Sequence, residues 1–245
     1  MRVLAFDTCL NACSAAVAET SGTVVAARCE AMRVGHAERL LPMIDEVLAG
    51  AGCTLADIEA IAVTVGPGTF TGIRVGIAAA RGFALAADLP VLGTTSLALL
   101  AATARAGLAA TDRSRPVAAC HDARKGEVLV EIIERFRGDA SLPPAPSPQE
   151  GGELVRRVRL LTPEATAALI ASSAPDALLV GSGAALVSDA ARARGVTLTV
   201  VAPGLEPDAR HLACLPLLPL EPPTPLYPRP PDAKPPADPA LTRTP

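Results

Sequence analysis

The order of apolar segments in the N-terminal part of the chain restricts the fold more than any other feature. Short apolar runs with strand character alternate with stretches in which apolar residues recur at helical spacing. The expected strands cover residues 2–7, 12–19, 23–31, 58–65 and a short run near Val91. The expected helices cover about residues 36–50, 71–87 and 96–105. Three strands in series, followed by alternating helices and strands, predict an α/β fold with a mixed sheet covered by helices.

A second, shorter unit follows a polar stretch near residues 111–115. The segment "PVAACHDARKGEVLVEIIE" predicts two strands joined by a turn around residues 124–126. Thr162-Pro163-Glu164 is a typical helix start, with threonine as the N-cap and proline at the first helical position. The remaining expected elements are a strand at "DALLV", a helix after "GSG" that runs through Arg194, a strand over 196–201 and a closing helix from about Pro207 to Leu218.

These patterns divide the chain into three expected regions. Residues 1–110 form a first lobe, and residues 111–218 form a second, smaller lobe that contains a Pro-rich loop at 139–152 and the closing helix. Residues 219–245 form a Pro-rich tail. Because proline lacks a backbone N–H donor, this tail is expected to be extended or disordered.

Charge and composition limit the classes of function. The net charge of −3 argues against dominant binding to a polyanion, and one Tyr, four Phe and no Trp leave little material for stacking on bases. The six cysteines contain no C-x-x-C pair. No run of 18 or more apolar residues lacks charges, so no membrane span is expected. The N-terminus has the pattern of a buried strand and not of a signal peptide, which favours a cytoplasmic protein.

The stretch "VGPGTFTGIRVGIAAARG" (65–82) places glycines between an apolar strand and a helix. A helix N-terminus with free N–H groups is a general site for anions. However, Gly66, Gly68 and Gly72 give the spacing G-x-G-x-x-x-G, which differs from the dinucleotide fingerprint, and the loop has no lysine for a Walker A motif. The spacing therefore gives only weak support to phosphate binding.

The helix after this loop carries a stripe of small residues. Gly72, Gly76, Ala80 and Ala84 recur every four residues. Because each interior glycine costs about 1 kcal/mol relative to alanine, two of them require a structural reason. Close approach of a second helix is the reason that fits the spacing. That helix could belong to this chain or to another chain, and the spacing leaves both open.

Several other positions could hold a cofactor. Asp7-Thr8, at the end of the first strand, is similar to the first phosphate loop of the actin and sugar-kinase superfamily, although no glycine follows and a turn or capping role is an equal alternative. "LLVGSGAAL" (178–186) is similar to the adenosine-side turn of that superfamily, or is a simple turn between strand and helix. The candidate cofactor-binding residues are Asp7, Gly66, Gly68, Thr69, Gly181 and Gly183.

Other catalytic signatures do not occur in the sequence. His36, His121 and His211 have none of the spacings of a helical metal site, and no G-x-S-x-G elbow occurs, so neither a metal ligand set nor a catalytic residue is predicted. Asp122 and Arg124 lie near a strand end, where they could form a local ion pair or project into a cleft between the lobes.

Several motifs together resemble one family. They are "LAFDT", "ACSAAV", "HAERLLPMIDEVL", "VGPGTFTGIRVGIAAARGFA", "LPVLGTTSL", "DARKGEV", "VGSG" and, near the end, "PLYPRP". They occur in the same order in the TsaB (YeaZ) family, subunits of the bacterial tRNA threonylcarbamoyladenosine complex. The resemblance implies an actin-like, ribonuclease-H-type two-lobe fold of the ASKHA superfamily.

The resemblance also implies a function. Members of the family are non-catalytic subunits that dimerise with and activate the catalytic transferase (TsaD-type), which forms N6-threonylcarbamoyladenosine at position 37 of tRNAs reading ANN codons. A small ATPase subunit (TsaE-type) joins them, and tRNA is met only through the complex. The transferase carries a paired-histidine metal motif, whereas the corresponding stretch "GTTSLALLAATA" (93–104) has no histidine. The chain alone is expected to bind no cofactor, and ATP or ADP would belong to the assembled complex.

The family pairs through two helices of the first lobe, here about 36–50 and 71–87. The interface residues implied by the resemblance are His36, Leu40, Ile44, Gly72, Ile73, Gly76, Ile77 and Ala80. The free chain could also form a homodimer through the same helices. The alternative function is an ATP-dependent small-molecule kinase of the actin-like superfamily, which would use the candidate cofactor-binding residues as its phosphate and adenosine loops.

Overall fold

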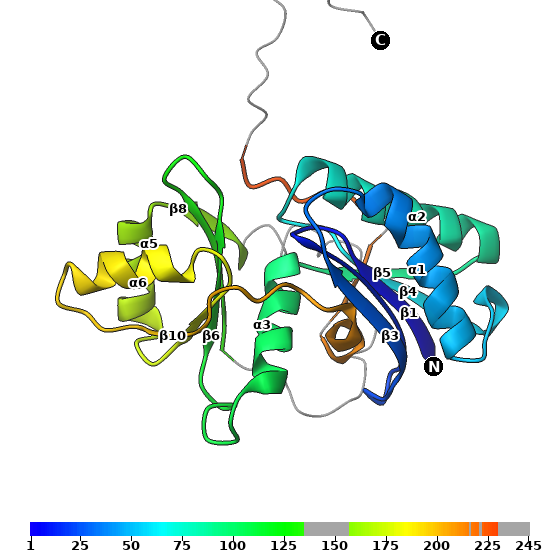
Figure 1. Cartoon of the computed structure of the whole chain (residues 1–245), viewed down its shortest axis with the longest axis horizontal. Helices are drawn as coiled ribbons and strands as arrows, with labels where there is room; N and C mark the ends of the chain where they lie inside the picture. The colour runs from blue at the N-terminus through cyan, green and yellow to red at the C-terminus, as the bar shows by residue number, and fades with distance from the viewer. Residues whose placement is uncertain (135–156, 216, 221, 230–245) are drawn as a thin grey trace, which may run out of the picture.

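The structure, a computed structural model, describes residues 1–134, 157–215, 217–220 and 222–229. It contains two sheets in two lobes, with helix α3 (Ser96–Gly107) between them (Figure 1). The expected loop at 139–152 and the last sixteen residues of the expected tail, 230–245, lie outside the described residues.

The first sheet has the strand order β11-β5-β4-β1-β2-β3. Its strands are β1 (Arg2–Asp7), β2 (Ala12–Glu19), β3 (Val24–Ala31), β4 (Ala60–Thr64), β5 (Val91–Thr94) and β11 (Leu218–Pro219). Strands β1, β2 and β3 are antiparallel neighbours, whereas β4 and β5 extend the sheet in parallel to β1. Helices α1 (His36–Gly50) and α2 (Phe70–Ala87) cover one face, and a short 3-10 turn, η1 (Leu55–Asp57), precedes β4.

The second sheet repeats this order as β10-β9-β6-β7-β8. Its strands are β6 (Val117–Asp122), β7 (Val128–Ile133), β8 (Arg159–Leu161), β9 (Leu178–Val180) and β10 (Thr199–Ala202), and its helices are α5 (Pro163–Ser173) and α6 (Ala184–Arg192). Again three antiparallel strands, β6, β7 and β8, come first, and the parallel strands β9 and β10 extend the sheet from β6. The two lobes therefore share the ribonuclease-H-type topology of the actin-like fold, as the family resemblance implied.

Strand β1 is buried on both faces, which explains its continuous apolar run. Leu4 and Phe6 point into the core under α1 and α2, whereas Val3 and Ala5 point to the opposite face. The two lobes are joined at α3, where the hydroxyl of its N-cap, Thr95, donates a hydrogen bond to the buried carboxylate of Glu131 on β7.

The C-terminal part of the chain differs from the expectation. Instead of a helix from 207 to 218, the structure has a 3-10 segment, η3 (Ala209–Cys214), followed by strand β11. The side chain of Asp208 accepts a hydrogen bond from Arg210 N, and prolines on both sides of the segment leave too little room for a regular helix. Ala209 and Leu212 pack with Val3 on the first sheet, so this segment does not close the second lobe.

The Pro-rich tail packs on the first lobe where the structure describes it. Strand β11 pairs with β5, and Leu220 and Leu226 are buried in the first core. Leu226 N donates to Val65 O at 2.7 Å, and Arg81 Nε donates to Pro223 O at 3.1 Å. A proline-rich sequence without helical or strand periodicity can still be held by such contacts. Of the two expectations for the tail, extended or disordered, the extended one fits residues 219, 220 and 222–229.

The glycines of α2 allow close approach by a loop of the same chain. An added Cβ at Gly72 would lie 2.0 Å from Thr8 O, and one at Gly76 would lie 2.8 Å from Thr8 Oγ1. Thr8 Oγ1 donates to Gly72 O at 2.7 Å. The neighbour that the small-residue stripe accommodates is therefore the loop between β1 and β2, and not a second helix.

Helix α2 is long and apolar enough, by length and composition alone, to cross a membrane. This is weak evidence, because helices packed on the core of a globular domain meet the same test. In this fold one face of α2 lies on the first sheet through Ile73, Ile77 and Ala80, and the helix carries Arg74 and Arg81.

We expect Gly72→Ala to lower the free energy of unfolding by more than about 2 kcal/mol, because the new methyl group would overlap the Thr8 carbonyl. Gly82→Ala is the matched control in the same helix, since an added Cβ there has no neighbour within 4 Å. It should be neutral or stabilising by up to about 1 kcal/mol. Urea denaturation of the two variants measures this difference, and equal effects would contradict the packing described here.

Candidate functional site: an interlobe cleft and an apolar groove

A cleft of about 400 Å³ lies where the two lobes meet. The carboxyl ends of β1 and β6, the equivalent central strands of the two sheets, both lead into loops that line it. The loop after β1 contributes Asn11, and the last two residues of β6 itself, His121 and Asp122, line the second-lobe side. Pro67, Gly68 and Thr69 line the first-lobe side, and residues 226–229 of the C-terminal segment complete the wall.

Asp7 does not line this cleft, although it ends strand β1. Its carboxylate is fully buried and accepts hydrogen bonds from Thr64 Oγ1 and, at 3.4 Å, from Cys9 N. The other carboxylate oxygen has no hydrogen-bond partner among the described residues. Burial raises the pKa of Asp7 from 3.8 to about 6. The sequence left open whether Asp7 serves a phosphate loop or a local turn. Its burial and its hydrogen bonds favour the structural role.

The backbone of the β1–β2 loop packs directly against the glycine loop at residues 66–69. Thr69 N donates to Cys9 O at 2.8 Å, and an added Cβ at Gly68 would lie 2.1 Å from that same carbonyl. The side chain of Thr69 caps α2 by accepting from Gly72 N at 3.1 Å, and Gly66 O accepts from Ser96 N at 2.9 Å. The amide of Thr69, which would face a phosphate in an open loop, is thus already bonded.

The "GSG" turn has a similar structural reason for its glycines. Gly181 has a φ of +89°, and an added Cβ would lie 2.6 Å from Cys120 O. An added Cβ at Gly183 would lie 3.1 Å from the carbonyl carbon of His121. Both glycines allow the turn to lie against the end of β6, so that Ser182 between them reaches the cleft.

Ser182 belongs to a small polar group on the second lobe. Its Oγ accepts from Asp122 N at 3.1 Å and lies 3.0 Å from His121 Nδ1. Burial lowers the pKa of His121 below its usual value of 6.5, so the ring is neutral at pH 7. Asp122 Oδ1 accepts from Arg124 N at 2.8 Å, and the two side chains form an ion pair at 4.0 Å. Asp122 and Arg124 therefore form the local ion pair and also line the cleft between the lobes, so both roles considered from the sequence apply.

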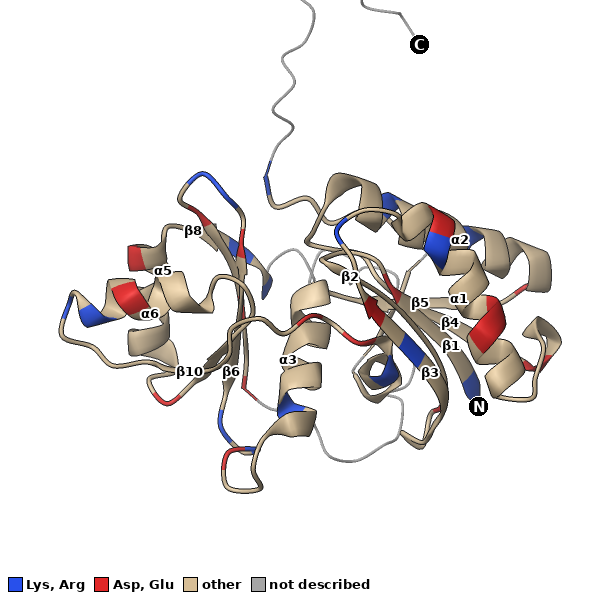
Figure 2. Ribbon diagram, in the orientation of Figure 1, with Lys and Arg blue, Asp and Glu red and all other residues tan. Residues whose placement is uncertain are grey.

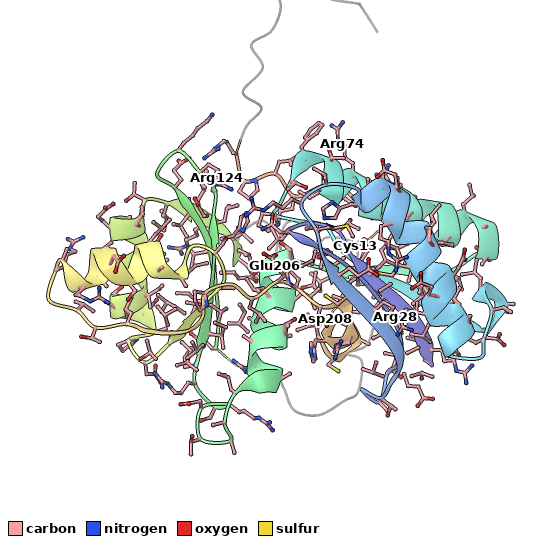
Figure 3. The ribbon with its side chains drawn as sticks, viewed as in Figure 1. Cys13, Arg28, Arg74, Arg124, Glu206 and Asp208 are labelled. Atoms are coloured by element: carbon pink, nitrogen blue, oxygen red, sulfur yellow. The ribbon has the colours of Figure 1, made fainter. Side chains whose placement is uncertain are left out.

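Sequence reasoning missed the cleft residues that come from distant segments. Arg33 follows β3, and Tyr227 and Arg229 come from "PLYPRP", a motif noted in the sequence but given no role. The Tyr227 ring stacks on Phe70 with ring centres 5.7 Å apart. Arg74, labelled on α2 in Figure 3, lies 3.7 Å from the centre of the Phe70 ring. Arg229 forms an ion pair with Glu127 of the second lobe. The C-terminal segment therefore contacts both lobes at the mouth of the cleft.

The eight expected interface residues are not on the surface. His36, Leu40, Ile44, Gly72, Ile73, Gly76, Ile77 and Ala80 are all buried within the chain. His36, for example, is enclosed with its Nε2 3.1 Å from Leu10 O. Helical spacing identifies an apolar face but not what covers it, so the assignment of these side chains to a partner surface stays a prediction. Leu40, although buried, also lines a groove between α1 and α2.

The outer faces of the same two helices do form an exposed apolar surface. A groove of about 590 Å³ runs between α1 and α2. Its lining includes Ala37, Leu41, Val75, Ala79, Phe83 and Ala86. Leu41 is 53% exposed, and Leu85 beside the groove is 89% exposed. We refer to this surface as the α1/α2 groove. Among the described residues, no group of three or more His, Cys, Asp or Glu side chains could hold a metal ion.

Asp7 makes stability depend on pH. Its folded-state pKa of about 6 lies above the ordinary 3.8, so the folded chain retains a proton that the unfolded chain has lost. Stability from this group is therefore present at low pH and falls as pH rises from about 4 to about 6. Asp7→Asn should remove this loss and raise the free energy of unfolding at pH 7.5 by up to about 3 kcal/mol, with much less gain at pH 4.5.

Urea denaturation at the two pH values tests this prediction. Asp45→Asn, at an exposed position of α1, is the control and should change stability little at either pH. A gain for Asp7→Asn that is the same at both pH values would show that the buried carboxylate is not the cause.

Known proteins with similar sequences belong to one biosynthetic system. The model of a family described as TsaD, tRNA N6-adenosine threonylcarbamoyltransferase, matches residues 29–141. The Escherichia coli K12 protein named tRNA threonylcarbamoyladenosine biosynthesis protein TsaB is 44% identical over 135 residues, or 55% of this chain and 56% of that protein. The match thus spans just over half the length of this curated relative.

Two solved structures match over most of their length. YeaZ from Pseudomonas aeruginosa is 29% identical, with a TM-score of 0.70 over 92% of this chain and 99% of that chain. A second structure, titled as an uncharacterized protein with similarity to peptidase YEAZ from Pseudomonas aeruginosa, is 31% identical, with a TM-score of 0.66 over 86% of this chain and 88% of that chain. With the shared two-lobe topology and the ordered motifs, these matches show that the chain belongs to the TsaB (YeaZ) family.

Proposed function

We propose that this chain is a non-catalytic subunit in the synthesis of N6-threonylcarbamoyladenosine at position 37 of tRNAs reading ANN codons. In this role it pairs with a TsaD-type transferase and activates it. Family membership supports the pathway, and the match of residues 29–141 to the transferase model supports a common ancestry with the catalytic subunit. Two paralogous chains of one fold can pair through equivalent surfaces in a pseudo-symmetric way.

The observation that carries the proposal is the α1/α2 groove. Exposed apolar patches of this kind mark interaction sites on proteins. The groove combines leucine, valine and phenylalanine side chains with alanine and Gly82, which allow a partner helix to come close. This revises the earlier interface assignment: the same two helices are proposed, but through their outer faces. A second copy of the chain could occupy the groove when the transferase is absent.

A catalytic role has less support. The residues expected to hold a nucleotide are buried or bonded within the chain, as described for Asp7 and Thr69. This weakens the alternative of an ATP-dependent small-molecule kinase. Residues 93–104, at the start of α3, also contain no histidine for the metal motif that the family resemblance assigns to the transferase. We further propose that a TsaE-type ATPase and tRNA meet the chain only within the complex, in the cytoplasm.

Leu41→Glu should weaken binding to the TsaD-type subunit at least tenfold, because association would bury a carboxylate in an apolar groove without a partner. Calorimetric titration of the purified transferase subunit into the variant measures this. Leu186→Glu is the matched control, since Leu186 is 44% exposed on α6 in the other lobe. If both variants bind like the original chain, the groove is not the pairing surface.

Depleting the chain in its own cells should remove most of the N6-threonylcarbamoyl mark from tRNA, as measured by mass spectrometry of nucleosides. Re-expression of the original chain or of Leu186→Glu should restore the mark, whereas Leu41→Glu should not. Normal levels of the mark in depleted cells would overturn the proposed function, and rescue by Leu41→Glu would leave the function but reject the groove.

A further inference from the structure

The rim of the interlobe cleft is positively charged, although the chain as a whole has a net charge of −3. The charged side chains that line the cleft are Arg33, Arg124 and Arg229, against a single carboxylate, Asp122. The three arginines come from the end of β3, the turn between β6 and β7, and the C-terminal segment. Figure 2 shows basic residues on both sides of the gap between the lobes, on the edge where the C-terminal trace leaves the fold.

These guanidinium groups are available to a ligand. Arg33 is exposed and makes no hydrogen bond or ion pair with any described residue. The side chain of Arg124 is 82% exposed, and its ion pair with Asp122 is long at 4.0 Å. Arg229 pairs with Glu127 at the solvent edge, with side chains 31% and 35% exposed. Exposed pairs of this kind contribute little net stability, so an anion can replace the carboxylates as partner.

The rest of the cleft offers neutral hydrogen-bonding groups and an apolar wall. Thr69 and Ser182 provide hydroxyl groups, and His121 is neutral at pH 7 because burial lowers its pKa. Asn11 also lines the cleft, with its Nδ2 donating to Glu206 Oε1 at 3.0 Å. Leu10 and Leu226 form apolar parts of the lining. A volume of about 400 Å³ is within the range for small-molecule sites. Because guanidinium groups match the oxygens of an oxyanion in planar, bidentate geometry, the rim favours an oxyanion over a simple halide. Three guanidinium groups around one cleft suit a ligand with several negative charges, such as adjacent phosphates.

The ligand's phosphates cannot lie where the superfamily's phosphate loops would place them. The Asp7 carboxylate is buried, and the amide of Thr69 is bonded to Cys9 O. The cationic groups lie instead at the mouth of the cleft, and one of them is on the C-terminal segment. We propose that the interlobe cleft binds a small ligand with adjacent phosphate groups, such as pyrophosphate or the diphosphate of a nucleotide, through Arg33, Arg124 and Arg229. This binding is independent of the pairing through the α1/α2 groove.

Calorimetric titration of the full chain with sodium pyrophosphate tests the proposal. We expect one binding site per chain, with an affinity that falls as NaCl concentration rises. ADP should bind at least as tightly as pyrophosphate, and adenosine at least tenfold more weakly. Tyr227 is the only tyrosine and the chain has no tryptophan, so tyrosine fluorescence reports pyrophosphate binding beside the cleft.

Two arginine variants and one matched control locate the site. Arg33→Ala and Arg124→Asn should each weaken pyrophosphate binding at least tenfold. Lys125→Asn is the control for the second variant, because residues 124 and 125 lie in the same turn with similar left-handed φ values of 64° and 54°. Asparagine tolerates this backbone conformation at both positions. Lys125 does not line the cleft, so its variant should bind pyrophosphate within twofold of the original chain.

Three results would overturn the proposal. They are no detectable heat with millimolar pyrophosphate, unchanged affinity in both arginine variants, and adenosine binding as tightly as ADP. Circular dichroism and thermal melting of each variant show that it is folded before it is titrated. None of these measurements depends on the transferase subunit, so their outcome is separate from the test of the proposed function.

Discussion

Contact between the β1–β2 loop and the first half of α2 determines how the first lobe is built. Thr8 and Cys9 approach the helix so closely that Gly68, Gly72 and Gly76 cannot carry side chains. The backbone and hydroxyl hydrogen bonds across this contact hold α2 on the sheet and fill the loop that could otherwise have received a phosphate. One interaction therefore both closes a potential nucleotide site and presents the other face of α2 to solvent.

The two lobes are held together at two separate places. At the centre, α3 packs against the second sheet, and Thr95 donates to the buried carboxylate of Glu131, whose pKa is raised by burial. At the rim, the C-terminal segment packs Leu226 on the first lobe and pairs Arg229 with Glu127 on the second. A ligand held by the arginines would bind at the rim, where the C-terminal segment connects the two lobes. The groove lies on α1 and α2 and shares no lining residue with the cleft, so the two surfaces can work independently.

Much of the fold could be predicted from local patterns, and the errors have specific causes. The hairpin of β2 and β3, helices α1 and α2, and the capped start of α5 at Thr162 all lie where the sequence predicts them. The closing helix was mispredicted, and the packing of the tail was not foreseen, because prolines and isolated leucines carry no periodic signal. Leu226 is buried only because the first lobe offers a place for it. For the candidate sites, helical spacing identified the buried faces of α1 and α2 and not the exposed ones, and of the three cleft arginines only Arg124 was considered from the sequence.

The sequence by itself determined the order of strands and helices, the family and the need for close approach at the glycines of α2. Those properties depend on local periodicity, on motif order and on the absence of a side chain at single positions. Only the tertiary structure decided that the neighbour of these glycines is the chain's own loop. It also decided which face of α2 is left exposed and which distant arginines meet at the cleft. Such facts depend on contacts between residues far apart in the chain, and a local pattern reports that a face is apolar without reporting what covers it.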